Sequence, residues 1–147
     1  MKNTFVLLGS ILLSSCATIP IPIKEGDLIG TWATSEDFDG QTLHVEESFL
    51  PTSMYCSAVL DFSSKDLVLN LAEGAWSMRD NNLEITVGET WPANTDSHME
   101  GSWNVLALTR NHFEYEITNI LALKRFRTLD RGDYWCKLLR QLKGNAR

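Results

Sequence analysis

An alternation of apolar and polar residues with a period of two runs through most of the chain, and it restricts the fold more than any other feature. The clearest run extends from Met54 to Phe62, with Tyr55, Ser57 and Asp61 at the intervening positions. Side chains of a β-strand point alternately to opposite faces, so this pattern indicates a half-buried strand. We expect the following apolar residues to form its core-facing side: Met54, Cys56, Ala58, Leu60 and Phe62.

Three later segments repeat the alternation: Leu67 to Leu71, Leu83 to Val87, and Phe113 to Ile117. Sequences typical of turns separate these segments, because aspartate, asparagine and glycine accept the backbone conformations of tight turns. They are Asp39-Gly40, Asp80-Asn81-Asn82, Arg110-Asn111 and Asp130 to Asp133. Short strands joined by tight turns, without a long helical period, predict an all-β protein, either an antiparallel barrel or a sandwich.

Two segments are ambiguous. Residues 89–101, which include Trp91-Pro92, are expected to form a longer loop. Residues 134–142 fit a closing strand that forms a hairpin with residues 123–129, and they also fit a short terminal helix. We favour the strand, because a cysteine on it would reach Cys56 across the core.

The first sixteen residues are typical of a secretory signal. Lys2 provides a positive charge, and the apolar run from Phe5 to Leu13 is shorter than the roughly 18 residues that a membrane span needs. The sequence Leu13-Ser14-Ser15-Cys16 resembles the bacterial lipobox, in which the cysteine receives a diacylglycerol and becomes the new N-terminus. The alternative is an ordinary signal peptide with a coincidental cysteine. We expect a signal peptide over residues 1–15 and a lipoprotein anchored through Cys16.

The resemblance to bacterial lipoproteins also implies a location. Ala17, not aspartate, follows Cys16, and in enterobacterial lipoproteins this favours the outer membrane. We therefore expect a lipidated tether over residues 16–27, with acyl chains such as palmitate in the membrane and the protein facing the periplasm. Residues 28–143 then form one globular domain in the cell envelope.

Lipidation of Cys16 would leave an even number of cysteines, Cys56 and Cys136. An exported domain is in an oxidising compartment, so the pair predicts one disulfide. Two buried free thiols are the alternative. A metal site is not expected, because neither cysteine is close in sequence to another cysteine or a histidine.

Gly30-Thr31-Trp32 resembles the Gly-x-Trp motif that opens lipocalins and related calycin-type barrels. The later order of strands and turns is also similar to small bacterial lipocalin-like domains, and the resemblance covers roughly residues 28–118. It implies an antiparallel up-and-down β-barrel in which Trp32 packs across the closed end. The family often places an arginine from a late strand over this tryptophan, and the candidates are Arg125, Arg127 and Arg140.

Residues with catalytic or metal-binding potential are scattered. His44, His98 and His112 lie in different expected elements without metal-ligand spacing, and their positions suggest no serine–histidine–acid triad. Glu46 and Glu47 would lie on opposite faces of one strand and so would not form a catalytic pair. We expect no catalytic residues, no metal, no cofactor and no enzymatic activity.

Two tryptophans are candidates for ligand binding. Trp91 precedes Pro92 in the expected loop, and together with Trp103 it would line the mouth of a barrel. Simple packing is the alternative for both side chains.

Charge is unevenly distributed. Eight basic and two acidic residues follow Leu123, whereas four basic and seventeen acidic residues lie between Cys16 and Leu123. The basic end either meets anionic lipid headgroups or balances acidic strands within the fold, and we favour the second interpretation. The net negative charge of the chain and its expected export exclude nucleic acid as a partner.

These observations predict a lipid-anchored, non-enzymatic lipocalin-like barrel that binds a small apolar or amphipathic ligand at the cell envelope. The alternative is a solid barrel whose surface contacts an envelope protein or inhibits a lysozyme-type enzyme.

Overall fold

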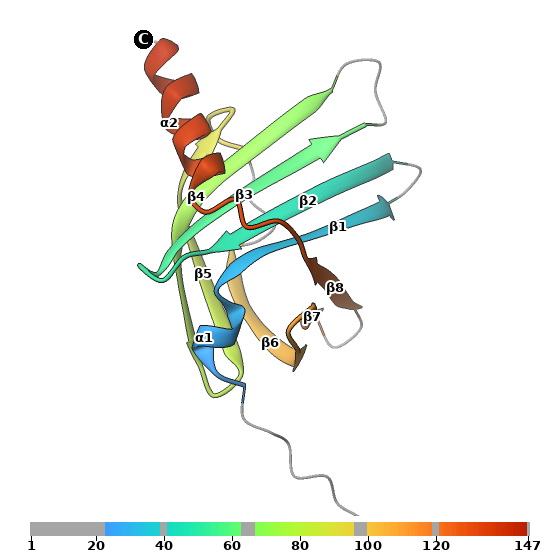
Figure 1. Cartoon of the computed structure of the whole chain (residues 1–147). Helices are drawn as coiled ribbons and strands as arrows, with labels where there is room; N and C mark the ends of the chain where they lie inside the picture. Colours follow the sequence, from blue (N-terminus) through green and yellow to red (C-terminus); the bar gives the residue numbers. More distant parts are fainter. Residues whose placement is uncertain (1–22, 39–40, 63–66, 96–99, 119–120, 147) are drawn as a thin grey trace, which may run out of the picture.

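Eight antiparallel strands form a closed up-and-down β-barrel, in which each strand pairs with its neighbour in sequence and β8 returns to β1 (Figure 1). The computed structural model describes residues 23–38, 41–62, 67–95, 100–118 and 121–146. The strands are β1 (Gly30–Phe38), β2 (Gln41–Phe49), β3 (Met54–Asp61), β4 (Val68–Arg79), β5 (Asn82–Trp91), β6 (Gly101–Leu108), β7 (His112–Thr118) and β8 (Leu121–Arg127). The all-β barrel expected from the sequence is confirmed.

Two helices accompany the barrel: α1 (Glu25–Leu28) before β1 and α2 (Tyr134–Asn145) after β8. Among the described residues, no helix is long and apolar enough to cross a membrane. The turn between β4 and β5 has positive φ at Asp80 and Asn81, as a tight hairpin turn requires and as their residue types predicted.

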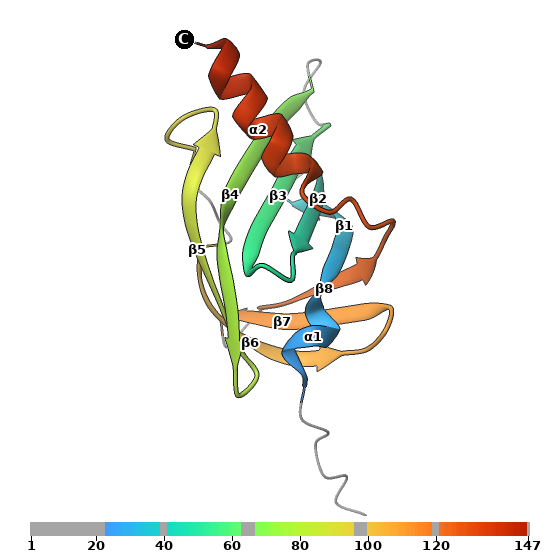
Figure 2. The same ribbon diagram turned by 60° about the vertical axis from the view of Figure 1, so that its left-hand side comes forward.

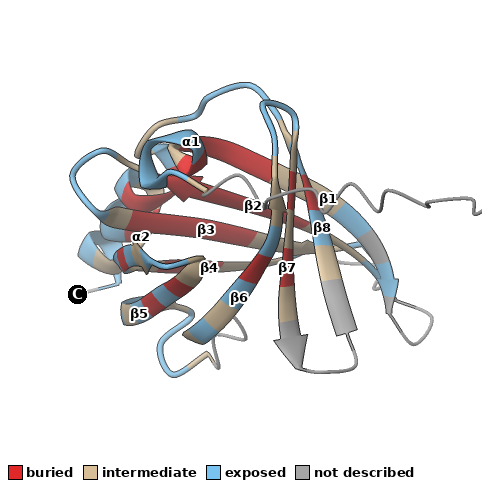
Figure 3. Cartoon of the chain, turned by 90° about the horizontal axis from the view of Figure 1, so that it is seen from below, coloured by how far each residue is buried: buried red, intermediate tan, exposed pale blue. Residues whose placement is uncertain are grey.

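The half of the barrel interior next to α1 is filled by aromatic and aliphatic side chains. Trp32 donates a hydrogen bond from its indole N–H to the carbonyl of Leu28, 2.8 Å away, which attaches α1 to the floor of the barrel. Figure 3 shows that the buried parts of the strands gather toward α1. The buried interior cluster consists of Leu28, Trp32, Phe49, Tyr55, Trp76, Leu83, Ile85, Val105, Phe113 and Tyr115.

The orientation expected for β3 is wrong. Tyr55 belongs to the interior cluster, whereas Cys56 and Ala58 belong to a second cluster, on the outer face of the barrel. Helix α2 covers this outer face (Figure 2), so β3 is buried on both sides. A period of two identifies the residues that share a face, but it does not tell which face is turned inward.

The C-terminal segment is a helix and not the closing strand that we favoured. Trp135, Leu138, Leu139 and Leu142 share one side of α2 and pack against the outer cluster. Their spacing of three and four residues is that of an amphipathic helix. Because β8 already closes the barrel by pairing with β1, no place remains in the sheet for another strand at this edge. The end of the chain therefore packs, as α2, on the outer face of the barrel.

Cys56 and Cys136 form a disulfide, as the sequence predicted. The bond joins β3 to the first turn of α2 on the outside of the barrel, so the expected path across the core is wrong. Both cysteines are fully buried, beneath the helix.

The barrel is most completely hydrogen-bonded near α1. Among the described residues, β1 and β8 pair only at Trp32–Arg127 and Ala33–Phe126, although both strands continue beyond these positions. β5 likewise pairs with β6 only as far as Ile85 and then continues to Trp91, which shortens the loop expected over 89–101. Figure 1 shows β6–β8 diverging from the long strands away from α1.

Replacing both disulfide cysteines by alanine should lower the free energy of unfolding by about 2–4 kcal/mol, because the unfolded chain is no longer constrained across 80 residues. Urea unfolding followed by tryptophan fluorescence measures the difference. Reducing agent should then destabilise the native protein and leave the double variant unchanged. An equal midpoint for the two oxidised proteins would contradict the expectation.

Candidate functional site

Four fully buried polar side chains form a belt across the barrel interior, directly above the aromatic cluster. Glu47 comes from β2, Tyr55 from β3, Tyr115 from β7 and Arg125 from β8. None exposes more than 1 % of its surface. The belt therefore connects strands on both sides of the barrel through its middle.

The carboxylate of Glu47 is the centre of the belt. It accepts hydrogen bonds from the Tyr55 hydroxyl at 2.9 Å and from Arg125 Nε at 2.7 Å, and a longer one from the Tyr115 hydroxyl at 3.4 Å. Arg125 also donates from Nη2 to the Tyr115 hydroxyl at 2.9 Å and from Nη1 to the carbonyl of Lys124 at 3.3 Å. Among the described residues, every buried side-chain polar atom has a partner.

Burial sets the electrostatics of this belt. Removal from water raises the pKa of Tyr55 well above its usual value, and the negative charge of Glu47 raises it further. Tyr55 therefore keeps its proton and acts as a hydrogen-bond donor. A buried charge pair costs desolvation energy that only good geometry and additional hydrogen bonds offset, and the two tyrosines supply such bonds.

Beyond the belt, away from α1, the inward-facing side chains are a mixture of aliphatic and polar groups, because Ser57 and Asn70 share this face with three valines. The register places Val45, Val59 and Val68 on the same inner face as Glu47. Val45 is buried, its cross-strand partner Val59 is half-buried, and Val68 at the start of β4 is 42 % exposed. This end of the barrel thus combines an inner wall of mixed polarity with access to solvent at Val68.

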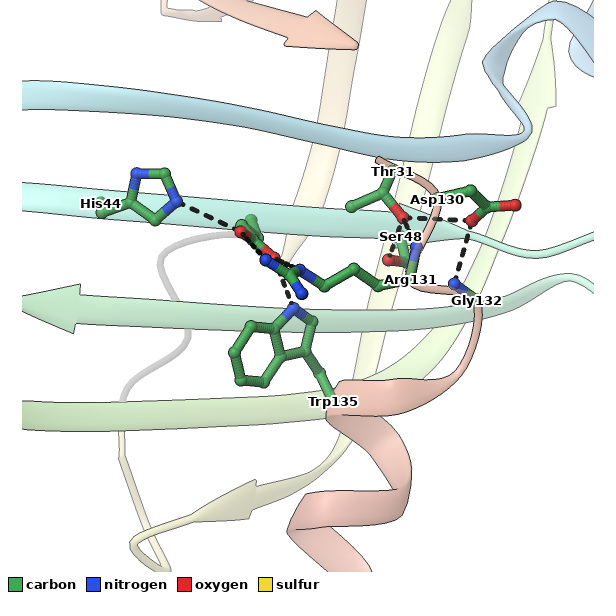
Figure 4. A network of polar contacts seen from close by, with 8 residues as sticks. Thr31, His44, Ser48, Asp130, Arg131, Gly132 and Trp135 are labelled. Atoms are coloured by element: carbon green, nitrogen blue, oxygen red, sulfur yellow. Dashed lines mark hydrogen bonds and ion pairs between the residues drawn. The ribbon is translucent and has the colours of Figure 1, made fainter. Parts of the chain in front are cut away.

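A second polar network attaches the segment after β8 to the outside of the barrel (Figure 4). The carboxylate of Glu46 accepts hydrogen bonds from Arg131 Nε at 2.7 Å and from the indole N–H of Trp135 at 2.9 Å. Burial opposes the ionisation of Glu46, but hydrogen bonds from Arg131, Trp135 and His44 outweigh it and lower its pKa. Glu46 and Glu47 lie on opposite faces of β2, as predicted.

Asp130 fixes the same segment where it leaves β8. Its carboxylate accepts hydrogen bonds from the backbone N–H of Gly132 at 2.9 Å and from the Thr31 hydroxyl at 3.3 Å. Thr31 also contacts the hydroxyl of Ser48 at 2.9 Å (Figure 4). The residues expected to form a hairpin turn instead lead the chain over β1 and β2 to α2.

The two tryptophans proposed for ligand binding do not lie together. Trp91 packs against the outer cluster beneath α2, and so it does not line the barrel mouth. Trp103 is half-buried and packs against the interior cluster, with its ring 6.4 Å from that of Tyr115. Only Trp103 remains adjacent to the belt.

The histidines also differ in their surroundings. His112 lies beside Glu114 and Phe126, whereas His98 falls outside the described residues. His44 contacts both Ser35 and Glu46, a meeting of a serine, a histidine and an acid that the sequence positions did not suggest. Within the described part of the chain, no three metal-ligating residues gather at one site.

The basic C-terminal segment balances acidic strands, as the favoured interpretation predicted. Arg125 pairs with Glu47 inside the barrel, and Arg131 pairs with Glu46 outside it. Further ion pairs join Lys124 to Glu114, Arg140 to Glu73 and Lys143 to Glu89.

Gly30 and Trp32, on which the resemblance to lipocalins rests, lie at the α1 end of the barrel together with a late-strand arginine. Of the three candidate arginines, Arg127 covers Trp32, with its guanidinium carbon 4.2 Å from the ring centroid. Gly30 has a φ of 133°, and a side chain there would collide with the Arg127 guanidinium. No protein-family model and no curated protein matches the chain.

Substituting Glu47→Gln should lower the free energy of unfolding by about 3–5 kcal/mol, because it leaves the charge of Arg125 buried without its counter-ion. Glu114→Gln is the matched control. It breaks a more exposed pair with Lys124, and a loss of about 1 kcal/mol or less is expected. Urea unfolding measures both variants, and equal losses would contradict the central role of the belt.

Proposed function

We propose that this chain is a lipid-anchored envelope protein whose barrel binds a small apolar or amphipathic molecule. The observation that carries the proposal is the group of three valines on the inner wall beyond the belt, of which Val68 is solvent-exposed toward the end opposite α1. Small-molecule sites typically combine apolar walls with a few fixed polar groups. Val45, Val59 and Val68 supply the apolar part of the wall, and the half-buried Thr34 and Asn70 on the same inner face supply the polar groups.

The belt also favours a particular kind of ligand. Glu47 and Arg125 neutralise each other's charge, so the floor of the site carries no net charge from this pair. An unneutralised ionic group would be costly to bury there. The apolar part of the ligand therefore packs against the valines of the wall, and any charged group stays near solvent.

Probe binding tests the ligand proposal. Val59→Trp places a large side chain on the inner wall, whereas Ser77→Trp places one on the exposed outer face of β4 and serves as the control. The affinity for the probe 1-anilinonaphthalene-8-sulfonate should fall about tenfold or more in Val59→Trp, a loss near 1.4 kcal/mol, and stay unchanged in the control.

Native mass spectrometry of the chain from Ile19 onward, exported to the periplasm, should also reveal a co-purifying small molecule. No co-purifying mass and no probe binding would overturn the ligand proposal. Circular dichroism of both tryptophan variants checks that each retains the barrel.

The anchor at Cys16 is supported by the lipobox resemblance and by the position of α1. The described chain begins at Ile23 beside α1, at the aromatic-filled end of the barrel (Figure 1). An anchor at Cys16 would therefore hold the barrel by the end of the chain that enters at α1.

Cys16→Ala should move the protein from the membrane fraction to the soluble fraction or block its processing, because the acyl chains that hold it at the bilayer are lost. Cell fractionation with immunoblotting measures the distribution. The double variant Cys56→Ala/Cys136→Ala is the control and should remain with the membrane. Unchanged fractionation of Cys16→Ala would exclude lipidation at this residue.

The second candidate function is a solid barrel that binds an envelope protein or inhibits a lysozyme-type enzyme. It is favoured by the dense aromatic packing below the belt, where Phe49 touches Tyr55, Trp76 and Phe113 with ring centroids 5.5–6.1 Å apart. Failure of the probe to bind, together with lysozyme inhibition by the purified protein, would support it.

A further inference from the structure

Ser35, His44 and Glu46 form a hydrogen-bonded chain on the outer face of the β1–β2 hairpin. Ser35 Oγ lies 2.9 Å from His44 Nδ1, and His44 Nε2 lies 3.3 Å from Glu46 Oε1. The strand register pairs Ser35 directly with His44, and Glu46 follows two residues later on the same face. The backbone thus holds the three groups in line.

The surroundings of Glu46 fix its ionisation and its orientation. Arg131 Nε and the indole N–H of Trp135 both donate to Oε2, and a longer contact of 3.4 Å joins Arg131 Nη2 to Oε1. The side chain is only 7 % exposed. An ionised carboxylate accepts a hydrogen bond from the N–H of a neutral imidazole, so Oε1 favours the tautomer with hydrogen on His44 Nε2.

This tautomer directs a lone pair of His44 Nδ1 toward the hydroxyl of Ser35. The hydroxyl then donates to the imidazole, and its oxygen lone pairs remain available. Ser35 is exposed and the His44 side chain is 30 % exposed, so a small molecule can approach the oxygen. The residues that β3 pairs with His44 and Glu46 are Leu60 and Ala58, which carry no charge.

We propose that Ser35 is a nucleophilic site that small carboxylic esters acylate, with His44 as the general base and Glu46 as a positioning residue. In this step Ser35 Oγ forms a bond to the ester carbonyl carbon, and the bond from that carbon to the alkoxy oxygen breaks. The serine proton passes to His44 Nδ1 and then to the departing alkoxide, which leaves as an alcohol. An acyl ester on Ser35 is the product.

The arrangement differs from the usual serine–histidine–acid triad in the orientation of its ring. The serine in that triad meets Nε2 and the acid meets Nδ1, whereas the two nitrogens exchange roles here. Either nitrogen acts as a base when the other carries the hydrogen, so the proton path is equivalent. The site lies on the opposite face of the wall from the ligand belt, because Glu46 points outward and Glu47 inward. It is therefore independent of the proposed ligand binding.

The test uses the full chain purified in detergent and treated with p-nitrophenyl acetate. Peptide mass mapping should locate one acetyl group on Ser35, and Ser35→Ala should remove it. Ser77, an exposed serine on the outer face of β4, is the internal control and should react at least about tenfold more slowly than Ser35.

Two further variants separate nucleophilic activation from a structural role. His44→Gln should slow acylation of Ser35 by about a hundredfold, and Glu46→Gln should slow it less. The urea midpoint of His44→Gln shows whether the fold is retained. Equal acylation of Ser35 and Ser77, or a rate insensitive to His44→Gln in the folded variant, would overturn the proposal.

Discussion

The ion pair between Glu47 and Arg125 is the interaction on which the closure of this barrel depends. β1 and β8 share only two backbone pairing positions among the described residues, so the ladder between them is short. The ion pair adds a connection from β2 to β8 through the interior, at 2.7 Å. Tyr55 and Tyr115 extend it to β3 and β7. The belt therefore reinforces the short β1–β8 ladder from inside the barrel, and it also separates the aromatic floor from the upper wall.

Much of the fold follows from local patterns in the sequence. Alternation predicted the strands, residue types predicted the turn at Asp80-Asn81, and the count of cysteines predicted the disulfide. The orientation of β3 and the nature of the last segment could not be predicted in this way. Both depend on α2 covering the outer wall, which is a contact between residues about 80 positions apart. Residues 134–142 also fit a period of two, because Tyr134, Cys136 and Leu138 alternate, so local periodicity did not decide between the two structures.

The polar sites differ in how far the sequence reveals them. Glu47 and Arg125 are 78 residues apart, and nothing in their local sequence indicates that they meet. The pairing of Ser35 with His44 was easier to predict, because the two-residue turn that the sequence Asp39-Gly40 suggests would give the hairpin this register. The alternation of side chains along a strand correctly predicted that Glu46 and Glu47 lie on opposite faces of β2. The partners of Glu46, Arg131 and Trp135, could not be predicted, because they depend on the path of the segment after β8. Trp91 was misplaced because β5 continues further than its turn signals indicated.

The attachment of α2 makes its local stability uneven along its length. The disulfide and the Trp135 hydrogen bond both act in its first turn, whereas the later turns are tied to the barrel by Arg140 and Lys143. The pairs made by these two residues are largely solvent-exposed, and salt screens them. Leu139 and Leu142 also pack against the barrel, so the last turn, beyond Leu142, is the part of the helix that opens in small, local fluctuations while the rest stays closed. Backbone amide exchange along α2 then increases toward Asn145, without any opening of the barrel itself.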